Sequence, residues 1–340
     1  MARAIRQLLI TAACIVVFTG IAAAQPSKVA GATCSAPPRM DCPGANCPAG
    51  LARADGNAVE PKSGRKYFLD YPCDLKPGEE VVFVLSLHGA GSIGNWQRHY
   101  FPIIDLKDKY RLVVATPTAA TSEPTRRWVG EADDVFLQNV TEQVFDAFGR
   151  DRIRAFWLAG HSQGGMTSRR VVCSDYFKTR VDGWLSLSGG RLGSTRTTFG
   201  RVPAAGATAP AATPTPAAEL PSCDFSFIYS AGQLEIESLP ATSPWAEKYG
   251  CGARERRVEI VDSRAGYVTA TDQSRGPSWG RHARPGTSEA YVYPKCRDGR
   301  VVADFVRLDK GHTEGLEPNV LEEIMKLMVS ARGGKARSAQ

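Results

Sequence analysis

The sequence predicts an α/β fold: a doubly wound, mostly parallel sheet in a single domain. Three nearly continuous apolar runs of strand length predict it, at residues 81–87, 112–116 and 155–159. Such runs are expected of strands that are buried on both faces of a sheet. Residues with a helical pattern lie between and after them, and strands that alternate with helices form parallel sheets with right-handed crossovers. The 340 residues suffice for one such domain.

The first 24 residues are expected to be a cleaved secretory signal peptide. Arg3 and Arg6 precede an apolar run at residues 8–21, and three alanines form a small-residue cleavage site before Gln25. The run is shorter than the roughly 20 residues that cross a bilayer, so no membrane span is expected after cleavage. Loss of the two arginines reduces the formal net charge from +7 to +5.

The cysteines indicate disulfides rather than a metal site. Nine cysteines become eight once Cys14 leaves with the signal peptide, and an even number in an exported chain is typical of disulfides. Cys42 and Cys47 are close in sequence, but no second close cysteine pair or histidine pair accompanies them. The positive charge is spread along the chain and is locally dense only at residues 254–257. We therefore expect no metal, no cofactor and no nucleic-acid partner.

The remaining elements follow in order along the chain. Residues 25–60 are rich in Ala, Pro, Gly and Cys without periodicity, which predicts a leader ahead of a domain at residues 61–332. An amphipathic helix is expected from about Asp133 to Phe148, with acidic residues favourable at its N-terminus. Further strands are expected at residues 65–71, 181–189, 225–230, 258–261 and 301–308, a short helix at 245–251, and a terminal helix from about 317 to 330.

Two segments break this alternation of strands and helices. Ala, Pro and Thr dominate residues 194–222, and such a composition buries too little apolar surface to order itself. A lid usually carries apolar side chains, so we expect a passive insertion rather than a lid there. Residues 333–340 are expected to be a disordered tail.

Residues 155–165 have the sequence of a nucleophile elbow. An apolar strand ends in the pattern Gly-x-Ser-x-Gly around Ser162 and passes directly into residues that can form a helix. This turn is so tight that only glycine fits at Gly160 and Gly164, and the serine adopts a strained conformation that exposes its hydroxyl. A glycine-rich turn without chemistry is the alternative. The flanking strand and helix favour Ser162 as a nucleophile.

A serine hydroxyl needs a base within hydrogen-bond reach. In hydrolases with such an elbow, the chain order is serine, acid, histidine. Of the five histidines, His282 and His312 follow Ser162. His282 lies in a predicted loop, and no strand next to it would place it at the edge of the sheet. His312, by contrast, directly follows the predicted strand at residues 301–308. We expect His312 to be the base rather than a surface histidine.

An acid must orient the imidazole and stabilise its cation. We expect it in the loop after the predicted strand at residues 225–230, where the acidic residues are Glu235 and Glu237. Glu235 is nearer to the strand and is the first choice, Glu237 is the second, and Asp262, after another short strand, is the third. Each could instead be a solvated loop carboxylate, which is the usual fate of a glutamate.

The oxyanion that develops during acyl transfer needs two backbone N–H donors. One is expected from Gln163, the residue after the nucleophile, and the other from Ala90 in the loop after the strand at residues 81–87. Glycines on both sides of Ala90 let the backbone approach a carbonyl oxygen. These two amides form the predicted oxyanion hole.

Several groups of residues occur together here as they do in a known family. They are His88-Gly89-Ala90-Gly91, Trp128 with residues 133–137, residues 160–165, residues 245–251, residues 293–296 and Gly311-His312. Over roughly residues 65–330, the chain resembles secreted polyhydroxybutyrate depolymerase and feruloyl esterase-like α/β-hydrolases. The resemblance implies an α/β-hydrolase fold, with the family's nucleophile at Ser162 and its base at His312.

The resemblance has further implications and two departures. The family's acid is usually an aspartate a few residues after His-Gly-Thr, and Ser-Ala-Gly stands there at residues 230–232, so a glutamate must serve. The family's Trp-Pro-Gly after the histidine is replaced by Thr-Glu-Gly at residues 313–315. The resemblance also implies a disulfide between Cys251 and Cys296.

We therefore expect a secreted serine carboxylesterase in which Ser162 attacks an ester and forms an acyl-enzyme. The expected substrate is a small or oligomeric ester of feruloyl, acetyl or hydroxyalkanoate type. A serine peptidase of the same fold is one alternative, although such peptidases usually carry a propeller or a long helical cap for which this chain has no room. A non-catalytic exported binding protein is the other, and the complete set of serine, glutamate and histidine argues against it.

Overall fold

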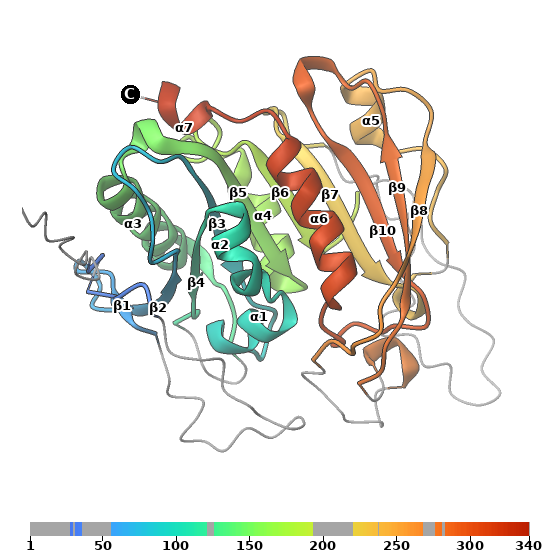
Figure 1. Ribbon diagram of the computed structural model, residues 1–340, viewed down its shortest axis with the longest axis horizontal. Coiled ribbons are helices and arrows are strands. Elements are labelled where there is room, and N and C mark those ends of the chain that lie inside the picture. The colour runs from blue at the N-terminus through green and yellow to red at the C-terminus, as the bar shows by residue number, and fades with distance from the viewer. Residues whose placement is uncertain are drawn as a thin grey trace, which may run out of the picture.

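The centre of the molecule is a mixed sheet of ten strands, which the described residues form (Figure 1). The computed structural model describes residues 28–29, 31–35, 56–120, 126–192, 220–236, 238–267, 276–280 and 283–339. The expected signal peptide lies outside these residues, as do most of the leader and of the insertion at residues 194–222.

The strands lie in the order β1-β2-β4-β3-β5-β6-β7-β10-β9-β8 across the sheet. The six from β4 to β10 are parallel, and the pairs at both edges are antiparallel. This confirms the predicted doubly wound, mostly parallel sheet, in the arrangement of an α/β-hydrolase. The bounds are β1 Ala58–Val59, β2 Lys66–Asp70, β3 Val81–Leu87, β4 Leu112–Pro117, β5 Ile153–His161, β6 Gly183–Leu187, β7 Ser226–Gly232, β8 Glu255–Val261, β9 Thr287–Tyr293 and β10 Val302–Arg307.

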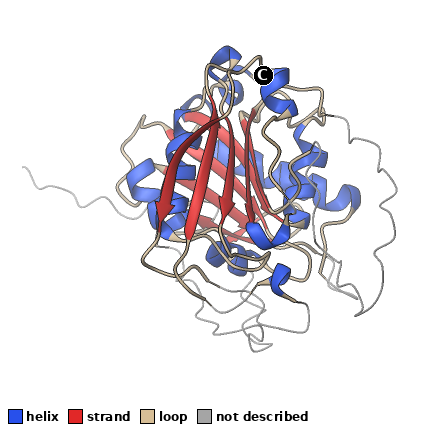
Figure 2. Ribbon diagram, turned by 90° about the vertical axis from the view of Figure 1, so that its right-hand side faces the viewer, coloured by secondary structure: helices blue, strands red, loops and turns tan. Residues whose placement is uncertain are grey.

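Helices cover both faces of the sheet (Figure 2). One hydrophobic cluster joins the sheet to α3 and α4, and a second joins its other face to α1 and α6. Among the described residues, no helix is long and apolar enough to span a bilayer. The helices are α1 Gly94–Tyr100, α2 Lys107–Tyr110, α3 Gly130–Phe148, α4 Gln163–Val172, α5 Pro244–Lys248, α6 Pro318–Ser330 and α7 Lys335–Ser338.

Strand β3 shows why its sequence is apolar throughout. Val81, Phe83 and Leu85 point into the first cluster, whereas Val82 and Val84 point into the second. Successive side chains of a strand face opposite sides of the sheet, so a strand covered on both faces needs apolar residues at every position. The continuous apolar runs therefore mark the central strands.

Helix α1 was not expected, because its sequence is polar. Its residues are nevertheless almost all buried. Arg98 is buried through an ion pair with Asp70 of β2, with Nε and Nη2 lying 2.9 and 2.7 Å from the carboxylate oxygens. A buried charge is tolerated when it is paired and hydrogen-bonded in this way. The ion pair between Arg98 and Asp70 allows the helix to be buried without an apolar stripe, so the sequence does not reveal it.

The C-terminal residues differ from the expected disordered tail. Residues 335–338 form the short helix α7, in which Ala336 is fully buried. The backbone N–H of Lys335 donates to Asp182, at 3.1 Å, and Arg337 donates to the carbonyl of Ile153, also at 3.1 Å. These tertiary contacts order a segment whose own sequence is too short and polar to form a stable helix alone.

Disulfides join segments that are distant in sequence. The predicted pair Cys251–Cys296 is confirmed, and it ties the end of α5 to the loop between β9 and β10. Cross-links of this kind are typical of proteins that fold outside the reducing cytosol. Cys42 and Cys47 lie outside the described residues. The three disulfides among the described residues are Cys34–Cys73, Cys173–Cys223 and Cys251–Cys296.

Candidate active site

Ser162 lies between the end of β5 and the first residue of α4, in a strained conformation. Its φ and ψ are 52° and −119°, outside the regions that non-glycine residues favour. Strain of this kind persists only where the surroundings enforce it, and it is common at functional sites. The local backbone therefore has the geometry that a nucleophile elbow requires.

The glycines around Ser162 are required by close backbone contacts. A Cβ on Gly160 would lie 2.3 Å from the carbonyl carbon of Gly164. A Cβ on Gly164 would lie 2.2 Å from the carbonyl oxygen of Leu87, at the end of β3. Both distances are shorter than any real contact between carbon and these atoms. The turn that carries Ser162 therefore packs closely against the ends of β3 and β5.

His312 follows β10 at the same edge of the sheet as Ser162. The ring of His161, which directly precedes Ser162, lies 4.6 Å from the ring of His312, centroid to centroid. His161 Nε2 donates to the carbonyl oxygen of His312, at 2.8 Å. Burial, together with the neighbouring His312 ring, holds the pKa of His161 well below its ordinary value. The neutral His161 therefore fixes the backbone of His312 beside the elbow.

Glu235 lies at the end of a 3₁₀ turn, Gln233–Glu235, that directly follows β7. Its Oε2 accepts a hydrogen bond from Nδ1 of His312, at 2.6 Å. Its Oε1 accepts hydrogen bonds from the backbone N–H of Gly232, at 2.7 Å, and from the hydroxyl of Ser188, at 2.8 Å. Glu235 and His312 are both buried. The carboxylate thus orients the imidazole through Nδ1.

The other sequence candidates lie elsewhere. Asp262 accepts hydrogen bonds from the backbone N–H groups of Asn319 and Val320, at 2.7 and 3.2 Å, so it caps the N-terminus of α6. Burial raises its pKa. Glu237 and His282 lie outside the described residues.

The two predicted oxyanion donors flank the elbow. Gln163 is the first residue of α4, whose N–H has no partner within the helix. Ala90 follows Gly89, on which a Cβ would lie 3.1 Å from Cβ of Ser162. The amides of Gln163 and of the loop at Ala90 therefore both belong to segments in contact with Ser162.

His88 holds the loop that carries Ala90. The amide of Ala119 donates to its Nε2, at 3.0 Å, so Nδ1 carries the proton and donates to the carbonyl oxygen of Gly89, at 2.7 Å. Trp128 packs on the ring and donates through Nε1 to the carbonyl oxygen of His88, at 2.8 Å. Burial lowers the pKa of His88 to about 4. The ring is therefore neutral, with one tautomer, near neutral pH.

Ser188, Tyr100 and Trp279 also belong to the site, although the sequence did not single them out. The hydroxyl of Tyr100 lies 3.5 Å from that of Ser188, which binds Glu235. The ring of Trp279 is 5.3 Å from that of His312. Ser188 lies at the C-terminal end of the strand predicted at residues 181–189 and directly follows β6, so its position at this edge of the sheet could have been inferred from the sequence. Tyr100 lies on a helix without an apolar pattern, and Trp279 lies in a loop.

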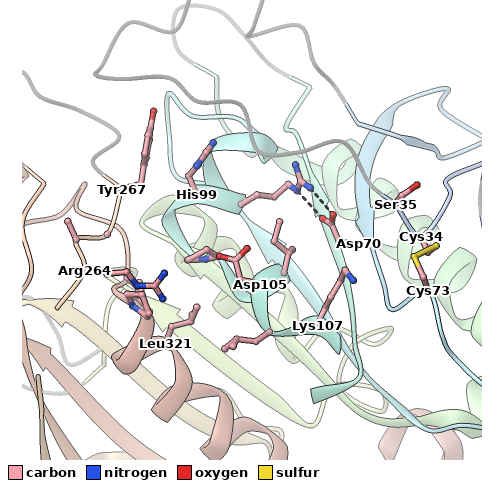
Figure 3. A pocket seen from close by; sticks show the side chains of 18 residues that line it. Cys34, Ser35, Asp70, Cys73, His99, Asp105, Lys107, Arg264, Tyr267 and Leu321 are labelled. Carbon is pink, nitrogen blue, oxygen red and sulfur yellow. Dashed lines mark hydrogen bonds and ion pairs between the residues drawn. A yellow bond between two sulfur atoms is a disulfide. The ribbon is translucent and has the colours of Figure 1, made fainter. Parts of the chain in front are cut away.

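A hollow of about 1000 Å³ lies between α1 and the start of α6 (Figure 3). His99, Tyr267, Arg264 and Leu321 line it, together with the ion pair formed by Arg98 and Asp70. Ser162 and His312 are not part of this lining. The candidate active site therefore lies outside the hollow. Within the described part of the chain, no cluster of side chains has the composition of a metal site.

Comparisons with known proteins concern the fold. No protein-family model matches the sequence, and a search of curated proteins found no match. Acetyl xylan esterase from Aspergillus awamori has a TM-score of 0.45 and 11% identity, over 78% of this chain and 94% of that one. The serine hydrolase FphF of Staphylococcus aureus has a TM-score of 0.29 and 20% identity, over 37% of this chain.

A third similar structure is Est1E of Butyrivibrio proteoclasticus with bound ferulic acid, which has a TM-score of 0.27 and 17% identity, over 36% of this chain. The matched part spans about half of FphF and of Est1E, at 52% and 48% of those chains. All three TM-scores are below 0.5. The fold is therefore established by the order and direction of the strands in this chain.

Proposed function

We propose that this chain is a serine carboxylesterase, with Ser162 as nucleophile, His312 as base and Glu235 as the acid that orients it. The hydrogen bond between Glu235 and His312 carries the proposal, because it stands at the edge of the sheet where a strained elbow presents Ser162. A carboxylate on Nδ1 leaves Nε2 to accept the serine proton.

The reaction proceeds in two halves. The Oγ of Ser162 bonds to the carbonyl carbon of the ester while His312 Nε2 takes the hydroxyl proton. The amides of Ala90 and Gln163 stabilise the negative charge on the carbonyl oxygen. The bond to the alcohol oxygen then breaks, and the imidazolium returns its proton to that oxygen. Water, activated by the same imidazole, hydrolyses the acyl-enzyme and restores Ser162.

The proposed substrates are small or oligomeric esters of feruloyl, acetyl or hydroxyalkanoate type. The resemblance to polyhydroxybutyrate depolymerase and feruloyl esterase-like hydrolases supports this choice. Rates on acetate, butyrate, ferulate and hydroxybutyrate esters of one alcohol rank the acyl groups. A much higher rate on one of these esters identifies the acyl group of the substrate.

We also infer that the protein acts outside the cytosol. The three disulfides favour an oxidising compartment, and the N-terminal residues have the pattern of a secretory signal. The N-terminal sequence of the exported protein should begin at or near Gln25. A mature chain that still begins at Met1 contradicts the cleavage.

Labelling by a fluorophosphonate tests the nucleophile. Wild-type protein should be labelled and should hydrolyse a p-nitrophenyl ester. Ser162→Ala should lose both properties and keep nearly the same melting temperature, since the change removes one hydroxyl oxygen. Labelling that persists in Ser162→Ala places the nucleophile elsewhere. Labelled wild-type protein that turns over no ester favours a peptidase, and unlabelled, inactive protein favours a binding protein.

A further inference from the structure

The segment at residues 276–280 lies against the loop that carries His312, and backbone hydrogen bonds hold it there. The N–H of His312 donates to the carbonyl oxygen of Ser278, at 2.9 Å. The N–H and the hydroxyl of Thr313 both donate to the carbonyl oxygen of Trp279, at 2.8 and 2.6 Å. The position of Trp279 relative to His312 is thereby fixed.

The indole of Trp279 stands almost perpendicular to the imidazole of His312. The ring centroids are 5.3 Å apart, and the planes meet at 80°. His161 also contacts this imidazole through its ring, but His161 is buried, whereas Trp279 is partly exposed. A molecule that reaches His312 from solvent can therefore contact the indole.

The proposed chemistry decides which part of an ester lies there. The imidazolium must protonate the departing alcohol oxygen, so this oxygen has to come within about 3 Å of His312 Nε2. The group attached to the alcohol oxygen then lies next to His312. The acyl group is attached to the carbon that Ser162 attacks and extends away from that oxygen. An indole at this distance from His312 is therefore within reach of the alcohol part.

We propose that Trp279 forms a wall of the subsite for the alcohol part of the ester and favours alcohols that carry a large, flat apolar group. An indole offers a wide apolar face, and contact with an aromatic group adds stabilisation beyond that of area alone. Methanol is too small to cover the indole. The inference rests on the proposed esterase function, since it takes His312 as the acid that protonates the leaving group.

Esters of one acid with different alcohols test the subsite. The substrates are methyl, benzyl and naphthylmethyl butyrate, and the proteins are wild type, Trp279→Ala and Trp279→Phe. Trp279→Ala should reduce kcat/KM about tenfold or more on the naphthylmethyl ester and less than about threefold on the methyl ester. Trp279→Phe should be intermediate. Ratios of variant to wild type cancel the intrinsic reactivity of each ester.

A second measurement uses one acyl-enzyme for all acceptors. Methyl butyrate forms the butyryl-enzyme, which either reacts with water or transfers its acyl group to added benzyl alcohol. By microscopic reversibility, the alcohol occupies the leaving-group subsite during transfer. The ratio of benzyl ester to butyrate should fall in Trp279→Ala by about the factor seen for hydrolysis of the benzyl ester. A purely structural effect on His312 slows both routes equally and leaves this ratio unchanged.

Three results overturn the inference. Equal losses on all three esters mean that Trp279 only supports His312. A variant that changes the preference among methyl acetate, butyrate and hexanoate, but not among alcohols, places the indole on the acyl side. An unchanged profile in Trp279→Phe, when melting curves show that Trp279→Ala is unfolded, also contradicts it. Failure of the esterase function itself is distinguishable, since wild-type protein is then inactive on every ester and unlabelled at Ser162.

Discussion

At the scale of single residues, the proposed acid is a glutamate whose position is set by a short turn. Glu235 closes the turn that follows β7, and the amide of Gly232 and the hydroxyl of Ser188 bind its Oε1. Its Oε2 is then directed at His312. These two hydrogen bonds fix the rotamer of the carboxylate. A glutamate can therefore occupy the place that an aspartate usually holds in the family that the sequence resembles.

Glu235→Gln should lower the esterase rate by about a thousandfold or more. The amide keeps the shape of the side chain, but it does not stabilise the imidazolium and can favour the wrong tautomer. Asp262→Asn is the matched control, because Asp262 caps α6 and binds no residue of the site. Asp262→Asn should hydrolyse the ester at the wild-type rate, once the rate is divided by the concentration of folded protein. The reverse result, a normal Glu235→Gln beside a crippled Asp262→Asn, contradicts the proposed acid.

His88 should make the protein less stable in mild acid. Its pKa is about 4 in the folded protein, because of burial, against an ordinary value of 6.5 in the unfolded chain. Between these pH values the unfolded chain binds more protons, so the free energy of unfolding falls as the pH is lowered from 6.5 to 4. The loss from this one group approaches about 3 kcal/mol.

Urea unfolding at a series of pH values measures this effect. His88→Gln has no proton to gain, so its stability should be lower at neutral pH but should fall less steeply in acid. Some pH dependence should remain, since the pKa of buried His161 is lowered in the same direction. Parallel curves for the variant and wild type would show that His88 does not contribute.

At the scale of elements, the elbow depends on the absence of side chains where β3, β5 and α4 meet. Gly164→Ala would place a Cβ 2.2 Å from the carbonyl oxygen of Leu87, and neither backbone can move without disturbing a buried strand. We expect a loss of more than about 3 kcal/mol, or no folded protein. Gly130→Ala is the comparison, because its Cβ meets no atom within 4 Å and only the positive φ of 55° opposes it.

Gly130→Ala should cost about 1 kcal/mol. Chemical denaturation of the two variants and wild type gives the difference directly. A Gly164→Ala protein as stable as Gly130→Ala would mean that the elbow is looser than these contacts require. Such a result would also weaken the argument that Ser162 is held in a strained conformation.

Elements were predictable from the sequence where burial dictates the pattern. The central strands are apolar because both of their faces are covered, and α3 and α6 carry an apolar stripe. Strand β9 was missed because its burial alternates but its polarity does not follow: polar Ser288 is buried, whereas Tyr291 and Val292 are only half-buried. Helix α1 was missed because an ion pair, rather than apolar contact, buries Arg98. Neither β9 nor α1 can be predicted from the sequence until the residues that pack against it are known.

The same reasoning divides the residues of the candidate site. Ser162, His312 and Glu235 could be located because each follows a strand that the sequence reveals, and the parallel sheet brings these strand ends to one edge. Trp279 and Tyr100 could not, since tertiary contacts alone bring them to His312 and His161. Local patterns therefore locate the proposed catalytic residues better than the side chains that surround them.

At the scale of the whole molecule, disulfides tie down the ends and loops of the sheet. Cys34–Cys73 anchors the N-terminal residues to the loop between β2 and β3, and Cys173–Cys223 joins the end of α4 to the segment before β7. A cross-link stabilises mainly by restricting the unfolded chain. These links hold the segments around the sheet in place.

The docking of α7 has a practical consequence for using the protein on a solid support. Arg337 binds the first residue of β5, and Ser162 follows the last, so the two lie at opposite ends of a nine-residue strand. At about 3.3 Å per residue, the strand separates them by roughly 30 Å. In Figure 1, the C-terminus lies at the top and the arrowheads of the parallel strands point downward. A linker attached behind α7 would leave the serine facing the solution, open to large or insoluble esters.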